Sequence, residues 1–320
     1  MYYTGLCKLE LSLVNRKTSW VAQLITRIWH RCWAALSYPK ALSSTMSAIQ
    51  NKHMMEDMCL VTNEADEVIA TASKKECHFK KGRLHRAFSL FLFRQATSQS
   101  GQPHLELLLQ RRASTKLTFP NLWTNTCCSH PLQNHPGETE EHKTLGVRLA
   151  AQRKVKHELG IDSWCLLPLE NIHFLTRILY SARNEPPDDI EWIEREIDYL
   201  LVSILPASVS GNAASHFLDI SPDEVSATAW KSLEAIETAA ADAEISPLPN
   251  AQSETTGTYN GHHTPWVRGL LRSGLLRRLW QWADARARLD ADASSPSLLE
   301  AFNRIDESWD RSLIHRLKTD

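Results

Sequence analysis

Apolar residues cluster into short runs that predict β-strands in the first two thirds of the chain. Residues 59–62 and 68–71 are apolar runs on either side of a polar turn, which is the pattern of a β-hairpin. Residues 87–93 are nearly all apolar, as expected of a central strand that is covered on both faces. Further strands are predicted at 105–110, 174–180 and 193–204, with a last strand near Ala227.

Other segments follow a helical period instead. Residues 144–158 repeat apolar positions along one side, and Gly160 follows them as a suitable C-terminal cap. Three more helices are predicted: a short Ala-rich one at 232–243, a long amphipathic one at 266–288 and a final helical segment at 297–317. Because helices alternate with strands, the pattern predicts an α/β layered sandwich.

Polar stretches and the composition of the ends define the predicted domain limits. The folded body is expected at 55–290, with polar inserts at 95–103 and 246–263 and a helical tail at 291–320. The second insert has no apolar period and is predicted to be a mobile loop. It lies next to Trp266, so it either regulates access to that region or only connects two elements.

The overall composition is that of a soluble globular protein. Hydrophobic residues make up 42% of the 320 residues and charged residues 23%, and the net charge is -1. This balance argues against nucleic acid or an anionic membrane as the main partner, since such proteins carry a basic excess. No run approaches the roughly 18–20 apolar residues that span a bilayer. Seven cysteines without scaffold spacing indicate a reducing compartment such as the cytoplasm.

Residues 1–50 differ from the rest of the chain in charge. They contain six Lys or Arg residues and one acid, Glu10, with a partly amphipathic pattern. This composition is typical of an organelle transit segment, mitochondrial or peroxisomal. A disordered leader, or an upstream start ahead of Met46, explains it equally well. In each case the segment is expected to lie outside the fold.

The segment 123–131, W-T-N-T-C-C-S-H-P, combines a thiol with an imidazole. If the segment is extended, Cys128 and His130 point to one face and Cys127 points to the other. Buried cysteines are common in protein cores, so the pair alone does not decide between packing and chemistry. Partners elsewhere in the chain are needed to make it a site.

Such partners occur at two other places. His78 and His85 flank the start of the predicted central strand, and Glu194 and Glu196 share one face of a later strand. Three imidazoles with two carboxylates suit a divalent transition metal such as Mn²⁺ or Zn²⁺. The alternative is that both acids belong to the solvated face of a half-buried strand.

Basic residues precede both the thiol segment and His78. Arg112 and Lys116 lie four residues apart before the thiol segment, and Lys74 lies four residues before His78. Phosphate groups need donors of this kind, although scattered solubilising charge is the alternative for each residue taken singly.

Residues 153–161, R-K-V-K-H-E-L-G-I, resemble the end of the Nudix motif, in which helix carboxylates hold Mg²⁺ on a diphosphate. Lys154 and His157 stand where Nudix hydrolases carry metal-binding carboxylates. Glu158 is the one helix carboxylate that remains, so it can hold Mg²⁺ together with a substrate diphosphate. Hydrolysis of that diphosphate by several metal ions is therefore not expected.

Six motifs in the same order together resemble type I isopentenyl-diphosphate Δ-isomerase over residues 55–290. They are H-F-K-K-G-R-L-H-R-A-F (78–88), L-L-L-Q-R-R-A-S-T-K-L-T-F-P (107–120), W-T-N-T-C-C-S-H-P, E-L-G-I, E-R-E-I-D-Y and T-P-W (264–266). The resemblance implies a Nudix-type α/β/α sandwich with a mixed β-sheet. It also implies an enzyme of isoprenoid and sterol biosynthesis that interconverts isopentenyl and dimethylallyl diphosphate, acting on a small molecule as a monomer.

The resemblance also assigns roles to individual residues. It implies a catalytic pair at Cys128 and Glu196, Tyr180 as hydrogen-bond partner of Glu196, and Trp266 in the pocket lining. It implies Mg²⁺ on Glu158 with the substrate diphosphate. The diphosphate-binding positions fall on Lys74, Arg112 and Lys116, and a second divalent ion, Mn²⁺, Zn²⁺ or Mg²⁺, falls on His78, His85, His130, Glu194 and Glu196.

Moving an unactivated double bond needs an acid and a base on opposite sides of a five-carbon chain, because it passes through a tertiary carbocation. We expect Glu196 to protonate carbon 4 and Cys128 to handle the proton at carbon 2, with the reverse assignment left open. A cation over Trp266 gains about 0.5–2 kcal/mol. The alternatives are a Nudix diphosphohydrolase, a non-catalytic Nudix-fold binding module, or a zinc-stabilised domain using Cys127, Cys128, His130 and His78.

Overall fold

The computed structural model describes residues 50–98, 100–162, 166–184, 192–206, 217–245 and 258–319. The predicted transit segment or leader at residues 1–50 lies outside these ranges, except for Gln50. The described strands form one ten-stranded sheet, with β10-β7-β8-β3-β1-β2 as its main order; β4 and β6 also pair with β3, and β5 and β9 pair with β4. The strands are β1 (Met58–Thr62), β2 (Val68–Ser73), β3 (His85–Thr97), β4 (Pro103–Arg112), β5 (Trp123–Thr124), β6 (Cys127–Ser129), β7 (His173–Arg183), β8 (Ile193–Ile204), β9 (Val225–Lys231) and β10 (Ile314–Arg316).

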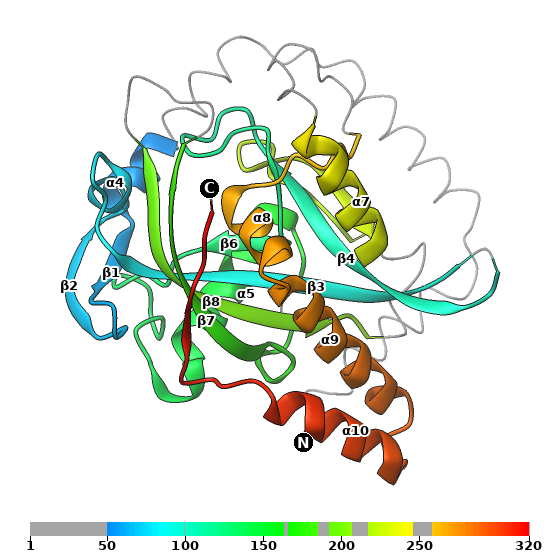
Figure 1. Cartoon of the computed structure of the whole chain (residues 1–320). Coiled ribbons are helices and arrows are strands. Elements are labelled where there is room, and N and C mark those ends of the chain that lie inside the picture. The colour runs from blue at the N-terminus through cyan, green and yellow to red at the C-terminus, as the bar shows by residue number, and fades with distance from the viewer. Residues whose placement is uncertain are drawn as a thin grey trace, which may run out of the picture. The chain divides into compact units, whose positions relative to one another are not determined.

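Helices cover both faces of this sheet. In Figure 1, α5 lies behind the sheet, and α8 and α9 cross in front of it. The helices are α4 (Lys74–His78), α5 (Leu145–Leu159), α7 (Leu233–Glu244), α8 (Pro265–Arg272), α9 (Leu275–Ala291) and α10 (Pro296–Glu307), with short 3-10 turns η1 (His142–Thr144) and η2 (Leu169–Asn171). The predicted α/β/α sandwich with a mixed sheet is confirmed.

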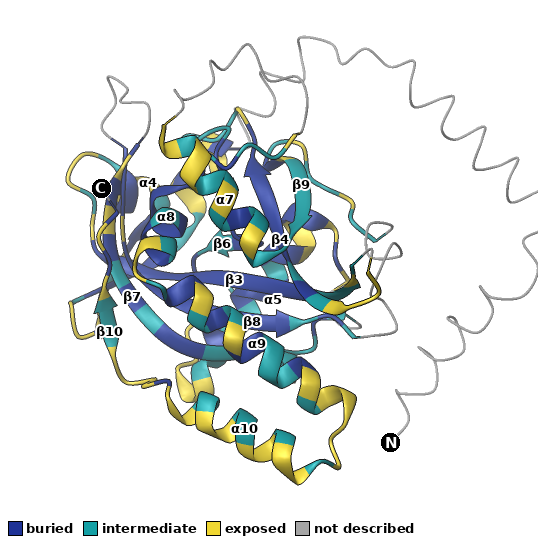
Figure 2. Ribbon diagram, turned by 45° about the vertical axis from the view of Figure 1, so that its right-hand side comes forward, coloured by how far each residue is buried: buried dark blue, intermediate teal, exposed yellow. Residues whose placement is uncertain are grey.

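Strand β3 is the central element and explains why residues 87–93 are almost all apolar. It is buried along most of its length, as the dark blue ribbon in Figure 2 shows. Phe91 and Phe93 face one hydrophobic core under α8 and α9, while Leu90 and Leu92 face a second core under α5. Alternate side chains of one strand therefore fill two separate cores, which a sequence shows as a continuous apolar run.

The pairing of β3 brings distant segments together. It runs parallel to β8, with His85 opposite Glu196, and antiparallel to β6, with Ser89 opposite Cys128. Because the side-chain period of a strand is two, this register fixes which residues share a face. The thiol segment and the acidic strand therefore lie on either side of the beginning of β3.

The long helix predicted at 266–288 is two helices in the structure. Helix α8 ends at Arg272 and α9 begins at Leu275. Gly274 between them has a φ of 73°, a left-handed conformation that glycine adopts without steric cost. The apolar period continues across the break, which is why it predicted a single helix.

The helical segment predicted at 297–317 is wrong in its second half. Helix α10 ends at Glu307, and Ile314–Arg316 instead form β10, which pairs in parallel with the edge strand β7. Leu317 then donates its backbone N–H to the carbonyl of Leu179 at 2.9 Å. An edge strand offers unpaired backbone groups, and this pairing outweighs local helical preference.

The first polar insert connects two long strands: β3 continues to Thr97 and β4 begins at Pro103. The second insert differs in part from its prediction. Residues 246–257 of the second insert lie outside the described residues. Residues 258–263, also predicted to be mobile, instead pack beside β5: His263 forms a parallel bridge to Trp123, and the ring of Tyr259 contacts that of Trp123.

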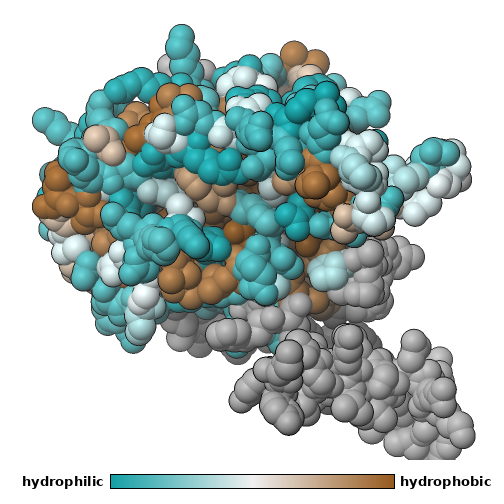
Figure 3. Space-filling model, turned by 90° about the horizontal axis from the view of Figure 1, so that it is seen from below, coloured by the Kyte–Doolittle hydropathy of each residue, from teal (hydrophilic) through white to brown (hydrophobic). Residues whose placement is uncertain are grey.

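The surface of the described residues is mixed in polarity. The face in Figure 3 shows hydrophobic groups in small patches separated by hydrophilic ones. Large hydrophobic residues that remain exposed include Ile69, Leu299 and Leu313. No helix within the described ranges has the length and apolar content needed to cross a membrane.

Candidate active site

Three histidines and two glutamates from separate elements meet at the start of β3 and β8. One candidate ligand atom from each of these five residues lies within 4.8 Å of the others. We call this group, all of it buried, the His/Glu cluster; its members are His78, His85, His130, Glu194 and Glu196. The cluster contains all the residues that the sequence suggested as ligands of a divalent transition metal.

Local structure explains how these side chains are aimed. Helix α4 begins with a capping box in which Ser73 and Glu76 bond to each other's backbone N–H, and this turn carries His78 into the interior. His78 donates its Nδ1–H to the carbonyl of Lys74 at 2.7 Å, and His85 donates its Nδ1–H to the carbonyl of Arg83 at 2.7 Å. Both imidazoles therefore present Nε2 to the cluster.

The donor set fits a bound divalent ion. Nε2 of His78 lies 2.7 Å from Oε2 of Glu194, but neither atom has hydrogen-bond geometry with any described residue. Nε2 of His85 is also buried without a hydrogen-bond partner among them. Buried polar atoms rarely stay unsatisfied, and imidazole nitrogens with carboxylate oxygens are ligands for ions such as Mn²⁺ or Zn²⁺.

Glu196 connects the cluster to the catalytic side of the cavity. Its Oε1 lies 2.8 Å from Nε2 of His130 and 3.5 Å from Nε2 of His85, and its Oε2 accepts a hydrogen bond from Tyr180 at 2.5 Å. Burial favours the neutral acid, but His85, His78 and Tyr180 lower the pKa of Glu196 to about 2. Burial and the nearby Glu196 raise the pKa of Tyr180 well above its usual value, so it remains a donor.

The two neighbouring cysteines face opposite ways, as the extended segment predicted. Cys128 lines the cavity, 4.0 Å from Nη1 of Arg112, whereas Cys127 is fully buried and donates to Oε2 of Glu158 at 3.3 Å. Burial raises the pKa of Cys128 to about 12, and Arg112 offsets this only in part. Cys128 is therefore a neutral thiol at physiological pH.

Trp266 forms an aromatic wall at the N-terminal end of α8. Its ring lies 5.9 Å from that of Tyr180 and 5.4 Å from that of Phe119, measured between centroids. Its indole N–H donates to Oδ1 of Asn125 at 3.0 Å, which fixes the plane of the ring. The guanidinium of Arg112 lies 5.8 Å from the ring centroid, so this indole already faces one cation.

The basic residues selected from the sequence line the same cavity. Lys74 belongs to the first turn of α4, Arg112 ends β4, and Lys116 lies in the turn that follows. Arg112 is held in place because its Nε and Nη2 donate to the carbonyl of Thr118 at 3.1 and 2.7 Å. The cavity thus has an acidic and imidazole wall, a thiol and aromatic wall, and a basic wall.

The comparisons with known proteins decide the family. A model described as a NUDIX domain matches residues 83–249. An isopentenyl-diphosphate delta-isomerase from Gibberella zeae is 41% identical over 238 residues, covering 72% of this chain and 79% of the relative. Isopentenyl-diphosphate Delta-isomerase I from Clarkia breweri is 37% identical over 262 residues, and the Schizosaccharomyces pombe enzyme is 41% identical over 202, each match covering 79% of the relative.

This chain belongs to the isopentenyl-diphosphate isomerase family. It is a member with the Nudix fold, as the six sequence motifs predicted.

Lys154 on α5 lines the cavity but was not selected as a site residue from the sequence. Its Nζ donates at 3.2 Å to Oε1 of Glu224, in the turn before β9, which was not selected either. The spacing of Lys154 four residues before Glu158 was a usable signal, since such residues meet on a helix, and here their charged atoms lie 3.0 Å apart. Glu224 lies in a turn with no periodic pattern.

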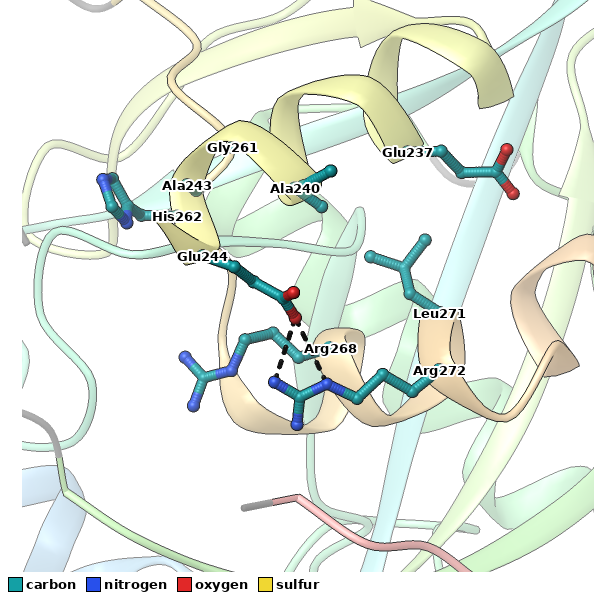
Figure 4. Close-up of a pocket in the computed structure, with 10 residues that line it drawn as sticks. Glu237, Ala240, Ala243, Glu244, Gly261, His262, Arg268, Leu271 and Arg272 are labelled. Carbon is teal, nitrogen blue, oxygen red and sulfur yellow. Dashed lines mark hydrogen bonds and ion pairs between the residues drawn. The ribbon is translucent and has the colours of Figure 1, made fainter. Parts of the chain in front are cut away.

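A second hollow lies away from this site, between α7 and α8. Figure 4 shows Glu244 of α7 reaching toward α8, where its Oε1 pairs with Nη2 of Arg272 at 3.1 Å. Glu237, His262, Arg268 and Leu271 also line the hollow. None of these residues belongs to the His/Glu cluster, and none was selected from the sequence.

Proposed function

We propose that this protein interconverts isopentenyl diphosphate and dimethylallyl diphosphate. The observation that carries the proposal is that Cys128 and the hydrogen-bonded pair Glu196 and Tyr180 line one cavity. Family membership supports the same activity. The reaction needs one proton added and another removed on a short apolar chain, and these groups are its donor and acceptor.

The proton steps follow from which groups are protonated. In the forward direction Glu196, with Tyr180 bonded to its other oxygen, delivers a proton to carbon 4 and leaves a tertiary cation at carbon 3. Cys128, as thiolate, removes a proton from carbon 2. The neutral thiol and ionised carboxylate of the structure are, in this assignment, the forms that begin the reverse reaction. The opposite division of roles uses the same two groups.

Two divalent ions are proposed, at different ends of the cavity. The His/Glu cluster would hold Mn²⁺, Zn²⁺ or Mg²⁺, and Glu158 would share Mg²⁺ with the substrate diphosphate. Such an ion in the cluster supplies positive charge beside Glu196, which sets how readily that carboxylate accepts or releases its proton. The residues that orient the cluster are the two backbone-anchored imidazoles, His78 and His85.

The other walls of the cavity suit the two ends of the substrate. Lys74, Arg112 and Lys116 would bind the diphosphate, with Lys154 beside them. The five-carbon chain would lie against Trp266, whose face stabilises a cation without attacking it. Packing of the five-carbon chain against Trp266 would also keep water away from the cation, which water would trap as an alcohol.

The oligomeric state, the cellular location and the partners of the enzyme are proposals as well. We expect a monomer that acts on a small molecule in the cytoplasm, without nucleic acid as a partner, or in an organelle if residues 1–50 direct it there. A non-catalytic binding module would require neither Glu196 nor Trp266.

The test is direct. The purified protein is incubated with isopentenyl diphosphate and Mg²⁺ in D₂O, and the products are followed by NMR. We expect dimethylallyl diphosphate and deuterium incorporation into the five-carbon chain. If neither product nor exchange is seen with Mg²⁺, Mn²⁺ or Zn²⁺ present, the protein is not an isomerase.

A further inference from the structure

The C-terminal segment, which the sequence assigned to a helical tail, joins two elements that form the cavity. Residues 314–319 run beside α8 in Figure 1, where they are drawn in red. We call these six residues the C-terminal strap. The strap begins as β10, which extends the sheet at the edge of β7 with His315 opposite Ile178 and Arg316 opposite Leu179. None of its residues lines the cavity.

The strap bonds to β7 on both sides of Tyr180. Leu317 donates its backbone N–H to the carbonyl of Leu179 at 2.9 Å, and the hydroxyl of Thr319 donates to the carbonyl of Ser181 at 2.7 Å. Since Leu179 and Ser181 precede and follow Tyr180, these two bonds fix the backbone that carries the phenol. Leu317 and Tyr180 also belong to the same hydrophobic core.

The strap contacts α8 at a glycine. Gly269 lies three residues after Trp266 and therefore on the same side of the helix. A methyl group at Gly269 would lie 2.8 Å from Cγ and Cδ2 of Leu317 and 2.8 Å from the carbonyl oxygen of Lys318. Carbon atoms in contact are normally about 3.5–4.0 Å apart, so only a glycine fits at this position. Glycine is disfavoured inside helices, and the close approach of the strap explains its presence here.

These contacts tie together two side chains of the active site. Tyr180 comes from β7 and Trp266 from α8, and their ring centroids lie 5.9 Å apart. Leu317 contacts α8 while its backbone bonds to β7, and all three side chains are buried in one core. Protein cores are packed closely enough to transmit small displacements, so a shift of the strap would move the indole relative to the phenol.

We propose that the C-terminal strap is a positioning element of the active site, which holds the ring of Trp266 against the developing cation through the contact of Leu317 with Gly269. Leu317 and Gly269 are positioning residues, because they act through Trp266 and do not line the cavity. The inference rests on the proposed function, in which Trp266 stabilises the tertiary cation. A strap that only covered the core would affect stability without any preference for a cation.

The first test measures binding and needs no turnover. Dimethylammonioethyl diphosphate carries a tertiary ammonium nitrogen in place of carbon 3, whereas isopentyl diphosphate has the same shape without the charge. Calorimetric titration with Mg²⁺ present gives a Kd for each, and the wild type should prefer the ammonium compound, which resembles the transition state. Leu317→Ala should weaken binding of the ammonium compound by about three- to tenfold, the range of a cation–π contact, and that of isopentyl diphosphate by less than about twofold.

Two further variants separate positioning from packing. Leu313→Ala is the matched control, because Leu313 belongs to the same C-terminal segment but is 45% exposed, and both affinities should stay as in the wild type. Thr319→Val keeps the size of the side chain but removes the bond to Ser181, so it should reduce the ammonium preference in the same direction and by less. It decides the matter if Leu317→Ala does not fold. Equal losses for both compounds, or no loss for either, would show that the strap only stabilises the fold.

The contact itself is tested from the side of α8. Gly269→Ala should also reduce the ammonium preference, because the added methyl group pushes α8 away from the strap. Gly269→Ala combined with Leu317→Ala should lose less than the product of the two single losses, since the shortened side chain leaves room for the methyl group and residues in contact are not additive. Additive losses would mean that the two residues act independently.

Steady-state kinetics completes the test. Leu317→Ala should lower kcat for isopentenyl diphosphate by about the same factor as its ammonium affinity, with KM nearly unchanged, because the lost interaction is made only in the transition state. A wild type that isomerises but binds both compounds equally would overturn the role of the strap and leave the proposed function standing. A wild type without isomerisation, but with an ammonium preference that Leu317→Ala reduces, would overturn the proposed function alone.

Discussion

The His/Glu cluster and the ionic network of Lys116, Glu224, Lys154 and Glu158, which we call the Lys154 network, neutralise their buried glutamates differently. In the His/Glu cluster, Nε2 of His78, Nε2 of His85 and Oε2 of Glu194 have no hydrogen-bond partner among the described residues. In the Lys154 network, both carboxylates are paired with the lysines of the chain itself. The first group therefore has donor atoms left for an ion from solution, whereas the carboxylates of the second are already paired with lysines before any ion or substrate binds.

This difference supports different roles for the two ends of the cavity. In the proposed function, an ion in the His/Glu cluster would change the acidity of Glu196 at the five-carbon end of the substrate, and the ammonium groups near Glu158 would bind the diphosphate.

The largest effect is expected from the two groups that exchange protons with the substrate. Glu196→Gln and Cys128→Ser should each lower kcat by about 10²–10⁴-fold, since that is the usual contribution of a general acid or base. Steady-state assays with isopentenyl diphosphate measure it. Activity within tenfold of the wild type in either variant would remove that residue from the proton steps.

A matched substitution in the Lys154 network separates the loss of a proton-transfer group from the loss of a buried negative charge. Glu224→Gln also neutralises a buried glutamate of the cavity, but we expect it to change KM more than kcat, because it alters the basic wall. Circular dichroism should show that all three variants keep the fold. Equal losses of kcat in all three would mean that the cavity does not divide its roles in this way.

The next largest effect is expected from the removal of a bound metal ion. Ligand binding to the folded state at 100 times Kd contributes about 2.7 kcal/mol to stability. Chelation should therefore lower the Tm of the metal-loaded protein by roughly 5–10 °C, and added Mn²⁺ or Zn²⁺ should restore it. Calorimetry with and without EDTA measures both shifts.

The His/Glu cluster and the Lys154 network should respond differently to chelation. His130→Ala removes an imidazole of the His/Glu cluster, so this variant should lose most of the Tm response to EDTA. Glu224→Gln should keep the full response, even if its Tm is lower throughout. A chelator response that survives His130→Ala and is lost in Glu224→Gln would reverse our assignment of the metal site.

The sequence was most informative where a simple period controls the geometry. Glu194 and Glu196 share a face because strand side chains alternate, and the same rule separates Cys128 from Cys127. The apolar run 87–93 predicted the central strand that brings these residues together. The side chains of the His/Glu cluster could therefore be chosen in advance, although their distances could not.

The sequence was least informative where distant backbone contacts decide. Residues 314–316 become a strand because the edge of β7 is available, and no local pattern shows that edge. Gly274 breaks an apolar period that continues on both sides. Glu224 reaches Lys154 and Lys116 from a turn, so the Lys154 network emerged only from the structure.

A smaller effect should come from the hydroxyl that donates to Glu196. Tyr180→Phe removes this hydrogen bond, and we expect kcat to fall by about 10–100-fold, which corresponds to about 1.4–2.7 kcal/mol, while KM changes little. Tyr199→Phe is the control, because Tyr199 packs on the opposite face of β8 and bonds to Asp66. Kinetics that shift equally in both variants would point to a general loss of packing.

The smallest effect is expected from the amide that donates to Glu158. Gln110 lies on β4, 3% exposed, and its Nε2 donates to Glu158 at 3.1 Å, while its Oε1 has no partner among the described residues. Gln110→Met keeps the volume but removes both groups, so a lost hydrogen bond is partly offset by a removed unsatisfied acceptor. The free energy of unfolding should fall by about 1 kcal/mol, and kcat should stay within threefold. Urea unfolding measures the first value. A kcat loss as large as that of Tyr180→Phe would show that Glu158, like Glu196, takes part in proton transfer, and the contrast between the two groups would fail.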